Sequence, residues 1–407
     1  MEVLTKIVLK SGKEQSLFRL HPWIFSGAIK QIEGNVKEGQ LVKVVDNKGN
    51  FLALGHYQIG SIAVRIISFK EIPIDYNFWK EKISASLKMR NALGLFKNDN
   101  LNVYRLVNAE GDEMPGLVID FYNGIAVTQF HSIGMYLIKD QIVQALQEVL
   151  GNSLTAVYDK SEGTMPFKAI VRPTNGWLTP SPALPQTGEG EEAWERVIVS
   201  EYGNKFIIDL FEGQKTGFYI DQRENRKLLE QNSYGKNVLN MFCYTGGFSV
   251  YALHGGAKLV HSVDSSAKAI ELTNKNVSLN FPEIKNHEAF AVDAFEYLNN
   301  MDDKYDLIIL DPPAFAKHNT ALNNALQGYK KINQKALEKI RKGGFLFTFS
   351  CSQVVSKENF RKSVFAASVN ARRKVSILHQ LSQPPDHPVS MYHPEGEYLK
   401  GLVLYVE

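Results

Sequence analysis

The stretch from residue 238 to residue 264 reads VLNMFCYTGGFSVYALHGGAKLVHSVD, and it decides the fold. It predicts a strand over 238–242, a helix over 248–254 and a second strand over 259–264, because short apolar runs flank a segment bounded by pairs of glycines. The alternation continues with an expected helix at 267–280, strands at 289–292 and 305–310, a helix at 325–342 and a strand at 345–349. Such alternation predicts an α/β domain in which a parallel sheet carries helices on both faces, as in Rossmann-like folds.

Upstream of this domain, residues 1–70 are expected to form a small β-barrel. Short strands with alternating apolar residues are clearest at 41–46 and 62–67, and residues 46–50 form a turn cluster after the first of them. Residues 71–190 predict an α+β middle domain. Amphipathic spacing predicts helices there at 78–93 and 135–150, and Asn123-Gly124 predicts a hairpin because both residues tolerate positive φ.

The run at 180–192 is rich in proline and then in acidic residues, and it predicts a linker because such sequence cannot add to a core. The expected domains are therefore 1–70, 71–190 and 191–407. A hairpin over 196–210, turning at Tyr202-Gly203-Asn204, opens the last one.

Bulk composition limits the class of protein. The 407 residues are 44% hydrophobic and 22% charged, which is typical of a globular protein, and no apolar run approaches the roughly 18 residues of a membrane span. The N-terminus reads as the start of a strand and lacks the order of a signal peptide. Two cysteines, Cys243 and Cys351, are too few for a disulfide framework and predict a reducing, cytoplasmic setting. The net charge of +3 permits an acidic partner without requiring one.

Three strand ends predict a nucleoside-type cofactor. In parallel α/β sheets, ligands bind outside the carboxyl ends of the strands. The first strand runs into a loop that contains Tyr244 and Gly246, where glycine lets the backbone approach a ligand closely. The second strand ends in Asp264, suited either to ribose hydroxyls or to capping the next helix, and Asp293 after the third suits an exocyclic amine.

The fourth and fifth strands end in residues suited to chemistry. Asp311 is followed by Pro312 and Pro313, whose rings fix the backbone, so this segment can hold a flat base by its Watson–Crick edge, with Phe315 as a stacking surface. Cys351 follows the fifth strand at the same edge and predicts a nucleophile. Cys243 lies in the glycine loop and is expected to be inert packing.

At this point the sequence resembles a known family, over nearly its whole length. It is similar to the bacterial large-subunit rRNA methyltransferases that join a PUA domain to a class I methyltransferase domain, the RlmI-like enzymes. The runs that carry the resemblance are 21–27 (HPWIFSG), 105–117 around NAEGD, 213–223, 311–315 (DPPAF) and 349–352 (FSCS).

The resemblance implies S-adenosylmethionine as cofactor and 5-methylcytosine in large-subunit (23S) rRNA as product. It implies that Asp264 holds the cofactor ribose, that Asp293 faces its adenine and that Gly246 lies along its methionine part. Arg223 is then a candidate for the methionine carboxylate, beside Gln222, and Cys351 is the nucleophile. Tyr244 and Pro312 complete the predicted cofactor-binding set.

These residue types suit that reaction. Carbon 5 of cytosine is a poor nucleophile until a thiolate adds to carbon 6, which requires a cysteine whose pKa is lowered. Asp311, protonated or sharing a proton, can stabilise the charge that builds at N3. The base must also leave its stack to reach such a pocket.

The barrel is the expected RNA-binding domain. Arg19, Lys30 and Trp23 are candidates for contacts with RNA, although Trp23 equally suits a core. Arg372-Arg373-Lys374 suits phosphate contacts or a plain solvated face. The sequence contains no cluster of His and Cys at the spacing of metal ligands, so it does not predict a metal site. The expected partner is large-subunit rRNA, without a membrane, and a homodimer is one assembly that the sequence allows.

Three alternatives remain open from the residues. Methylation of a base nitrogen also suits an acid-Pro-Pro-aromatic motif and needs no nucleophilic cysteine. A nicotinamide-dependent oxidoreductase suits the glycine turn and Asp264, although the third glycine of the dinucleotide pattern is missing. A ribosome-assembly factor is the third.

Overall fold

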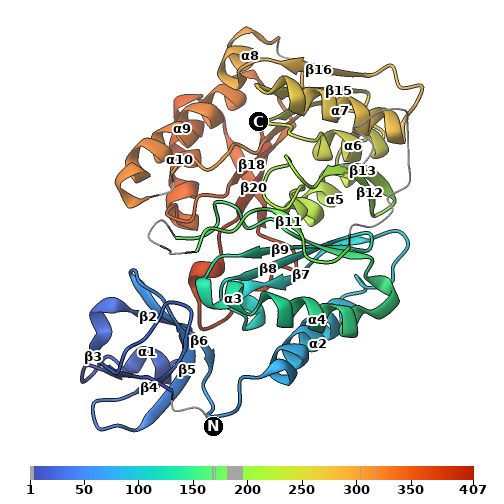
Figure 1. The fold of residues 1–407 in the computed structure, drawn as a ribbon. Coiled ribbons are helices and arrows are strands. Elements are labelled where there is room, and N and C mark those ends of the chain that lie inside the picture. Colours follow the sequence, from blue (N-terminus) through green and yellow to red (C-terminus); the bar gives the residue numbers. More distant parts are fainter. Residues whose placement is uncertain (1–3, 167–168, 170, 181–195, 303, 317) are drawn as a thin grey trace. The chain divides into compact units, whose positions relative to one another are not determined.

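A computed structural model describes residues 4–166, 169, 171–180, 196–302, 304–316 and 318–407 (Figure 1). The chain divides into two compact units. Unit 1 contains Met1–Val199, Ile208–Phe218 and Pro385–Gly396, and unit 2 contains Ser200–Ile207, Tyr219–Pro384 and Glu397–Glu407. From residue 181 on, the linker predicted at 180–192 lies outside the described residues.

Unit 1 begins with the six-stranded sheet that the sequence predicts as a small barrel. Its strand order is β2-β6-β5-β4-β1-β3, and every pair is antiparallel except β1 with β4. Val42 and Val44 of β4 and Val64 of β6 are fully buried in its core, because alternate side chains of a strand face the same side. The strands are β1 (Lys6–Leu9), β2 (Trp23–Phe25), β3 (Ile29–Glu33), β4 (Leu41–Val45), β5 (Phe51–Tyr57) and β6 (Ile62–Ser68).

The second part of unit 1 is a five-stranded sheet in the order β11-β10-β9-β8-β7, accompanied by helices. The predicted hairpin at Asn123-Gly124 is confirmed, with φ of 45° and 97° at the two residues between β8 and β9. The elements are α2 (Tyr76–Ala92), β7 (Val103–Asn108), β8 (Leu117–Tyr122), β9 (Ile125–Phe130), α3 (Ile133–Leu137), α4 (Lys139–Leu150), β10 (Ala156–Asp159) and β11 (Gly176–Trp177).

The single helix expected at 135–150 is two helices, and in this respect the prediction was wrong. Ser132 caps α3 by accepting a hydrogen bond from the Met135 backbone N–H, and the helix stops at Ile138, whose φ and ψ are −102° and 14°. Helix α3 packs against β5 at Gly134, where an added Cβ would lie 2.2 Å from the His56 ring. This close contact fixes α3 separately from α4, a tertiary constraint that periodicity does not reveal.

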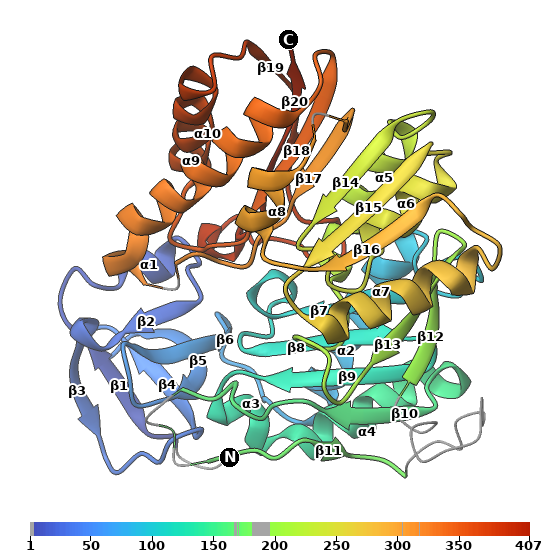
Figure 2. The same cartoon turned by 90° about the horizontal axis from the view of Figure 1, so that it is seen from above.

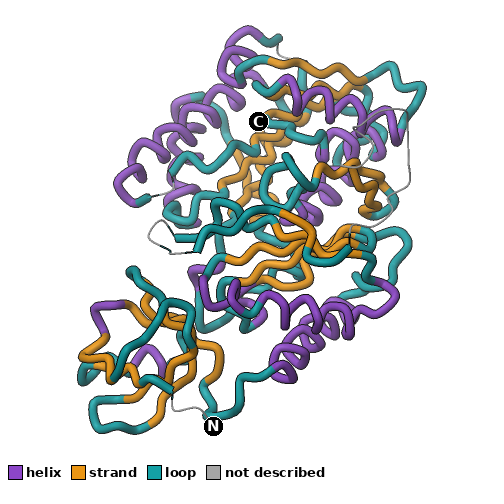
Figure 3. Tube along the Cα trace, viewed as in Figure 1, coloured by secondary structure: helices purple, strands orange, loops and turns teal. Residues whose placement is uncertain are grey.

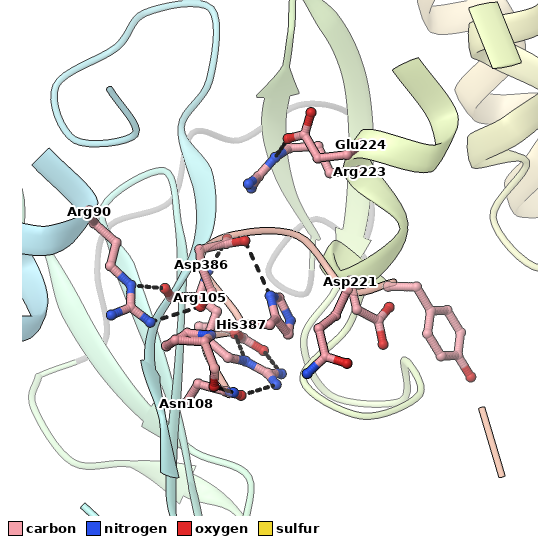
Figure 4. A network of polar contacts seen from close by, with 12 residues as sticks. Arg90, Arg105, Asn108, Asp221, Arg223, Glu224, Asp386 and His387 are labelled. Carbon is pink, nitrogen blue, oxygen red and sulfur yellow. Dashed lines mark hydrogen bonds and ion pairs between the residues drawn. The ribbon is translucent and has the colours of Figure 1, made fainter. Parts of the chain in front are cut away.

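Residues 385–396, which follow β19 far along the chain, belong to unit 1. Arg90 is fully buried and forms a two-pronged ion pair with Asp112, and its Nη2 also donates to the Asp386 carbonyl oxygen at 2.8 Å. The Asp386 carboxylate accepts from the Arg105 backbone N–H at 3.0 Å, and Asn108 donates to the Pro388 carbonyl oxygen at 2.9 Å (Figure 4). The run around NAEGD therefore holds this segment.

Unit 2 contains the predicted α/β sheet. Its strand order is β16-β15-β14-β17-β18-β20-β19, and its first five strands are parallel, as expected. The strands are β14 (Asn237–Met241), β15 (Leu259–Asp264), β16 (His287–Ala291), β17 (Leu307–Leu310), β18 (Gly344–Ser350), β19 (Val375–Leu381) and β20 (Lys400–Val406). Strand β20 is antiparallel to both of its neighbours, so two strands extend the sheet beyond the sequence-based prediction.

Helices cover both faces of this sheet (Figure 2). Helices α8, α9 and α10 pack on one face around a core that includes Leu298, Tyr329 and Val364, and α5, α6 and α7 cover the other. The helices are α5 (Arg223–Gln231), α6 (Gly247–His254), α7 (Ala267–Asn280), α8 (Ala294–Asn300), α9 (Leu322–Lys339) and α10 (Lys357–Asn370). The arrangement of helix, strand and loop along the trace is followed most easily in Figure 3.

The expected hairpin after the linker is present as β12 (Arg196–Glu201) and β13 (Asn204–Asp209), with Tyr202 and Gly203 at positive φ. Across the part of the chain that the structure describes, no helix combines the length and the hydropathy that crossing a bilayer requires.

Candidate active site

The glycine loop after β14 has an unusual backbone. Phe242, Tyr244 and Gly246 adopt φ of 59°, 48° and 75°, a region that side chains disfavour and glycine tolerates. Gly246 is the N-cap residue of α6, and among the described residues no side chain caps this helix there. A Cβ at position 246 would lie 2.8 Å from Thr273 Cγ2, so this position requires glycine. The first N–H groups of α6 thus open at the carboxyl edge of the sheet.

Asp264 ends β15 beside that loop. Its Oδ2 accepts a hydrogen bond from the Tyr244 backbone N–H at 3.0 Å, and its Oδ1 accepts from the Ser266 backbone N–H at 3.0 Å. The N-cap of α7 is Ser266, so Asp264 does not have the capping role that the sequence left open. A carboxylate has about four lone-pair positions, so this half-buried group retains capacity for hydroxyl donors.

Asp293 is exposed and caps helix α8. Its Oδ1 accepts from the backbone N–H groups of Phe295 and Glu296 at 2.8 and 3.1 Å. Because β16 lies beside β15, Asp293 follows the strand next to the one that ends in Asp264. The glycine loop, the Asp264 carboxylate and the Asp293 carboxylate lie at the ends of adjacent strands. Their hydrogen-bond donors and acceptors suit a nucleoside-type cofactor.

Arg223 is buried and its Nε donates to Glu224 Oε1 at 3.0 Å, as labelled in Figure 4. Its assignment to a cofactor carboxylate stays a prediction. A different arginine lies under the glycine loop. Arg226 forms a buried two-pronged pair with Glu201, at 2.8 and 2.7 Å, and an added Cβ on Gly247 would lie 3.1 Å from its Cδ. Arg226 was not predicted from the sequence. Its only signal there was its position three residues after Arg223, on the same face of α5.

Asp311 is held by Gln222, a residue from the 213–223 run. Gln222 Nε2 donates to Asp311 Oδ2 at 3.0 Å, and Gln222 is 2% exposed. Asn225 donates to Gln222 Oε1 at 2.6 Å. Because the amide oxygen already accepts from Asn225, the amide nitrogen must face Asp311.

Cys351 lies at the same strand edge as Asp311. Its Sγ lies 4.0 Å from the Pro312 carbonyl oxygen, and the residue is half-buried. Strands β17 and β18 are adjacent and parallel, with Leu310 opposite Thr348, which brings the two segments together. The structure therefore places Asp311, Pro312 and Cys351 side by side.

The second cysteine has a different environment. Cys243 is 6% exposed, and burial raises the pKa of its thiol to about 12, with Thr273 Oγ1 3.5 Å away. The thiol is thus neutral at physiological pH, as suits packing. No disulfide joins the two cysteines.

Two tyrosines lie near the glycine loop: Tyr244 is part of it, and Tyr219 contacts Tyr244. The rings of Tyr219 and Tyr244 meet edge to face, with centroids 5.2 Å apart. Burial raises the pKa of Tyr219, and the negative charges of Asp221, Asp311 and Cys351 act in the same direction. Tyr219 keeps its proton and can donate a hydrogen bond. It lies in the 213–223 run but was not singled out from the sequence.

The remaining predicted residues lie apart from this cluster or have structural roles. The Phe315 ring packs on Tyr329, with centroids 4.6 Å apart.

Trp23 is half-buried in unit 1 and donates through Nε1 to Glu110 at 2.8 Å, which favours the core role, whereas Arg19 and Lys30 are exposed. Arg373 donates to the Leu337 and Ile340 carbonyl oxygens at 2.9 Å, at the end of α9, so its guanidinium is not an open phosphate contact. Among the described residues, no group of His, Cys, Asp or Glu has the arrangement of a metal site.

Comparison with known proteins identifies the family. A family model described as S-adenosylmethionine-dependent methyltransferase matches residues 143–394, and a PUA-like domain model matches residues 7–69. The protein named ribosomal RNA large subunit methyltransferase I of Aeromonas hydrophila is 39% identical over 404 residues, which cover 98% of each chain.

Two solved structures have the same fold. A putative S-adenosylmethionine-dependent methyltransferase from Streptococcus mutans superposes with a TM-score of 0.80 at 24% identity, covering 98% of this chain and 99% of the other. A putative methyltransferase complexed with SAH gives a TM-score of 0.82 at 25% identity with the same coverage. The family model and the Aeromonas relative decide against the nicotinamide-dependent oxidoreductase. The chain therefore belongs to the S-adenosylmethionine-dependent methyltransferase family, with a PUA-like domain in its N-terminal region and S-adenosylmethionine as its cofactor.

Proposed function

We propose that this protein methylates carbon 5 of a cytosine in large-subunit ribosomal RNA through a covalent adduct with Cys351. The single observation that carries the proposal is the position of the half-buried Cys351 thiol, 4.0 Å from the Pro312 carbonyl oxygen and adjacent to Asp311. A packing cysteine would resemble Cys243, which is nearly fully buried. The name of the Aeromonas relative, which is matched over 98% of its length, supports ribosomal RNA as the substrate.

In this proposal the chain's residues hold the cofactor along the carboxyl edge of the sheet. Asp264 accepts hydrogen bonds from ribose hydroxyls, Asp293 faces the adenine, and Tyr244, Gly246 and Pro312 border the pocket. Arg223 remains the proposed partner for the methionine carboxylate. When bound, S-adenosylmethionine would supply the electrophilic methyl group that carbon 5 of the base takes, and S-adenosylhomocysteine would remain as the leaving group.

The protein residues supply the rest of the chemistry. The Cys351 thiolate adds to carbon 6, so that a sulfur–carbon bond forms while the carbon 5–carbon 6 double bond breaks. Asp311 shares a proton with N3, where negative charge builds, and Gln222 orients its carboxyl group. After methylation, carbon 5 loses its proton to a base, the double bond re-forms and the sulfur–carbon bond breaks, which restores the thiolate.

We also propose a division of roles along the chain. The PUA-like region 1–70 grips RNA, with exposed Arg19 and Lys30 as phosphate contacts, 71–190 forms the middle domain, and 191–407 carries catalysis. The cytoplasmic setting predicted from the two cysteines accords with a ribosomal substrate. The homodimer allowed by the sequence stays a prediction, which light scattering of the purified protein checks.

The test is nucleoside mass spectrometry of large-subunit rRNA incubated with S-adenosylmethionine and either wild type or Cys351→Ala. We expect new 5-methylcytosine with wild type only. A methylated nitrogen, or equal methylation by Cys351→Ala, contradicts the covalent mechanism and favours the alternative of nitrogen methylation. A catalytically dead variant that restores ribosome assembly in a deletion strain would favour the assembly factor instead.

A further inference from the structure

Strand β20 begins with a buried lysine at the same edge as Cys351. Lys400 lies opposite Ser350 in the antiparallel β18–β20 pair, and it is only 4% exposed. Its Nζ donates to the Ser352 carbonyl oxygen at 2.6 Å and to the Tyr398 carbonyl oxygen at 2.7 Å. One ammonium group therefore joins the residue after Cys351 to Tyr398, two residues before β20 begins.

We propose that Lys400 is a positioning residue for Cys351, which fixes the Ser350–Ser352 segment and supplies the positive charge beside which a thiolate is stable. A thiolate forms readily next to a lysine, an arginine or a protonated histidine. The inference rests on the proposed function, because it assigns Lys400 a purpose only if Cys351 is the nucleophile.

The charges around the thiol support this role. Tyr329 contacts the same segment as Lys400, since its hydroxyl lies 3.0 Å from Ser352 Oγ. The negative charge of a Cys351 thiolate raises the pKa values of Tyr219, Tyr329 and Lys400, and Lys400 is the cation of the three. Both tyrosines have raised pKa values, chiefly through burial, and remain neutral. Asp311, on the neighbouring strand, opposes a thiolate if it is charged, so a compensating cation is needed.

Lys400 itself remains charged at neutral pH. Burial lowers the pKa of its ammonium group to about 8, while Cys351 and Glu397 raise it and Lys357 lowers it further. A buried cation interacts with a nearby thiolate more strongly than an exposed one, because little water screens the pair. Lys357 is exposed and pairs with Glu397, so it makes a matched control.

A second chain of contacts leads from Lys400 to the other half of the site. Tyr398, whose carbonyl oxygen Lys400 holds, donates its hydroxyl to Asp221 Oδ2 at 2.7 Å. Asp221 directly precedes Gln222, which binds Asp311. Lys400 is thus connected to the segments that carry both proposed catalytic residues, which is the arrangement expected of a positioning group.

The test measures alkylation of Cys351 by iodoacetamide against pH in the full-length protein, with peptide mass spectrometry to separate Cys351 from Cys243. In wild type we expect an apparent thiol pKa below the roughly 8.5 of an ordinary cysteine. In Lys400→Met it should rise by about one unit or more, in Lys400→Arg by less, and in Lys357→Met hardly at all. Circular dichroism and calorimetry with S-adenosylmethionine establish that each variant is folded.

Methylation kinetics add a readout that a purely structural role would not move. The kcat of Lys400→Met should be about tenfold lower at pH 7 and recover towards pH 9, where more thiolate forms, with little change in KM for the RNA. A wild-type thiol pKa at or above the ordinary value overturns the inference without any variant. So does an unchanged alkylation profile in Lys400→Met.

The two proposals fail separately. Alkylation is measured without RNA or S-adenosylmethionine, so it reports only on the coupling between Lys400 and the thiol. If Cys351→Ala remains active, the covalent mechanism fails whatever the alkylation profile shows. If Cys351→Ala is inactive and Lys400→Met leaves the profile unchanged, only the role of Lys400 fails.

Discussion

Gln222 and Asp311 are joined by a hydrogen bond of 3.0 Å, although 89 residues separate them in the sequence. The bond links the N-cap residue of α5 with the first residue after β17. Asn225 fixes the direction of the Gln222 amide, so Asp311 receives an N–H group and not a carbonyl oxygen. The orientation of the proposed catalytic carboxyl group is therefore set from outside its own strand.

Replacing Gln222 by Met should lower kcat by about ten- to a hundredfold, because a hydrogen bond to a charged group contributes roughly 1.5–3 kcal/mol. Steady-state methylation of rRNA measures the loss, and calorimetry with S-adenosylmethionine should show affinity within a few-fold of wild type. Asn225→Leu is the matched variant, since it allows the amide to rotate without removing it, and it should cost less. A Gln222→Met enzyme with wild-type kcat would show that the bond to Asp311 has no catalytic role.

Gly246→Ala should weaken binding of S-adenosylmethionine by about tenfold or more, because a left-handed backbone costs roughly 1–2 kcal/mol for a residue with a Cβ. The added Cβ would also lie 2.8 Å from Thr273 Cγ2. Titration calorimetry measures the affinity. The double variant Gly246→Ala/Thr273→Ser removes the clashing methyl group but keeps the hydroxyl that donates to the Tyr244 carbonyl oxygen, so it should recover part of the affinity. No recovery would assign the whole effect to backbone strain.

Arg90→Met should destabilise unit 1 by about 3–5 kcal/mol, because it leaves the buried carboxylate of Asp112 without its cationic partner. Urea unfolding followed by tryptophan fluorescence measures this loss, since Trp23, Trp79 and Trp177 all lie in unit 1. Lys80→Met is the control. It breaks the exposed Lys80–Glu148 pair and should leave the transition where it is in wild type. If the urea transition shifted equally in the two variants, burial of the ion pair would not determine how much it stabilises unit 1.

Below pH 6.5 the stability of unit 1 should fall in part through His56. Burial lowers the pKa of this histidine to about 4, from 6.5 in the unfolded chain. Because the unfolded chain binds the proton more tightly, the free energy of unfolding should decrease by up to about 1.4 kcal/mol per pH unit as pH falls from 6.5 towards 4. His56→Phe retains a ring against Trp79 but cannot titrate, so its unfolding free energy should depend less steeply on pH in this window. Parallel pH profiles for the two proteins would rule out this contribution.

The strand-end residues were predictable because their positions follow from local pattern. Asp264, Asp293, Asp311 and Cys351 each stand directly after a run of strand-forming residues, and parallel strands bring their carboxyl ends to one edge. The five parallel strands were found for the same reason. Strand β19 was missed because its side chains are mostly exposed, so its sequence lacks the apolar run of a central strand.

The contacts that join distant segments could not be read from the sequence. Lys400 meets Ser352 only because β20 pairs antiparallel with β18, and that pairing follows from the whole sheet. Its one signal was a single charge at the start of the apolar run Gly401–Val406. Likewise, the NAEGD run was recognisable as a motif, but its role in holding Pro388 depends on a segment about 280 residues later.

The interleaving of the two units has a consequence for synthesis on the ribosome. The chain passes between the units at 199/200, 207/208, 218/219, 384/385 and 396/397. The buried Arg90 receives its contact from Asp386 only after that residue has emerged from the exit tunnel. Unit 1, although its six-stranded sheet is translated first, therefore cannot complete its core before nearly all of unit 2 has been made. Nascent-chain proteolysis should find this sheet protected early and the region around Arg90 protected only late, so the two units mature together and not in the order of translation.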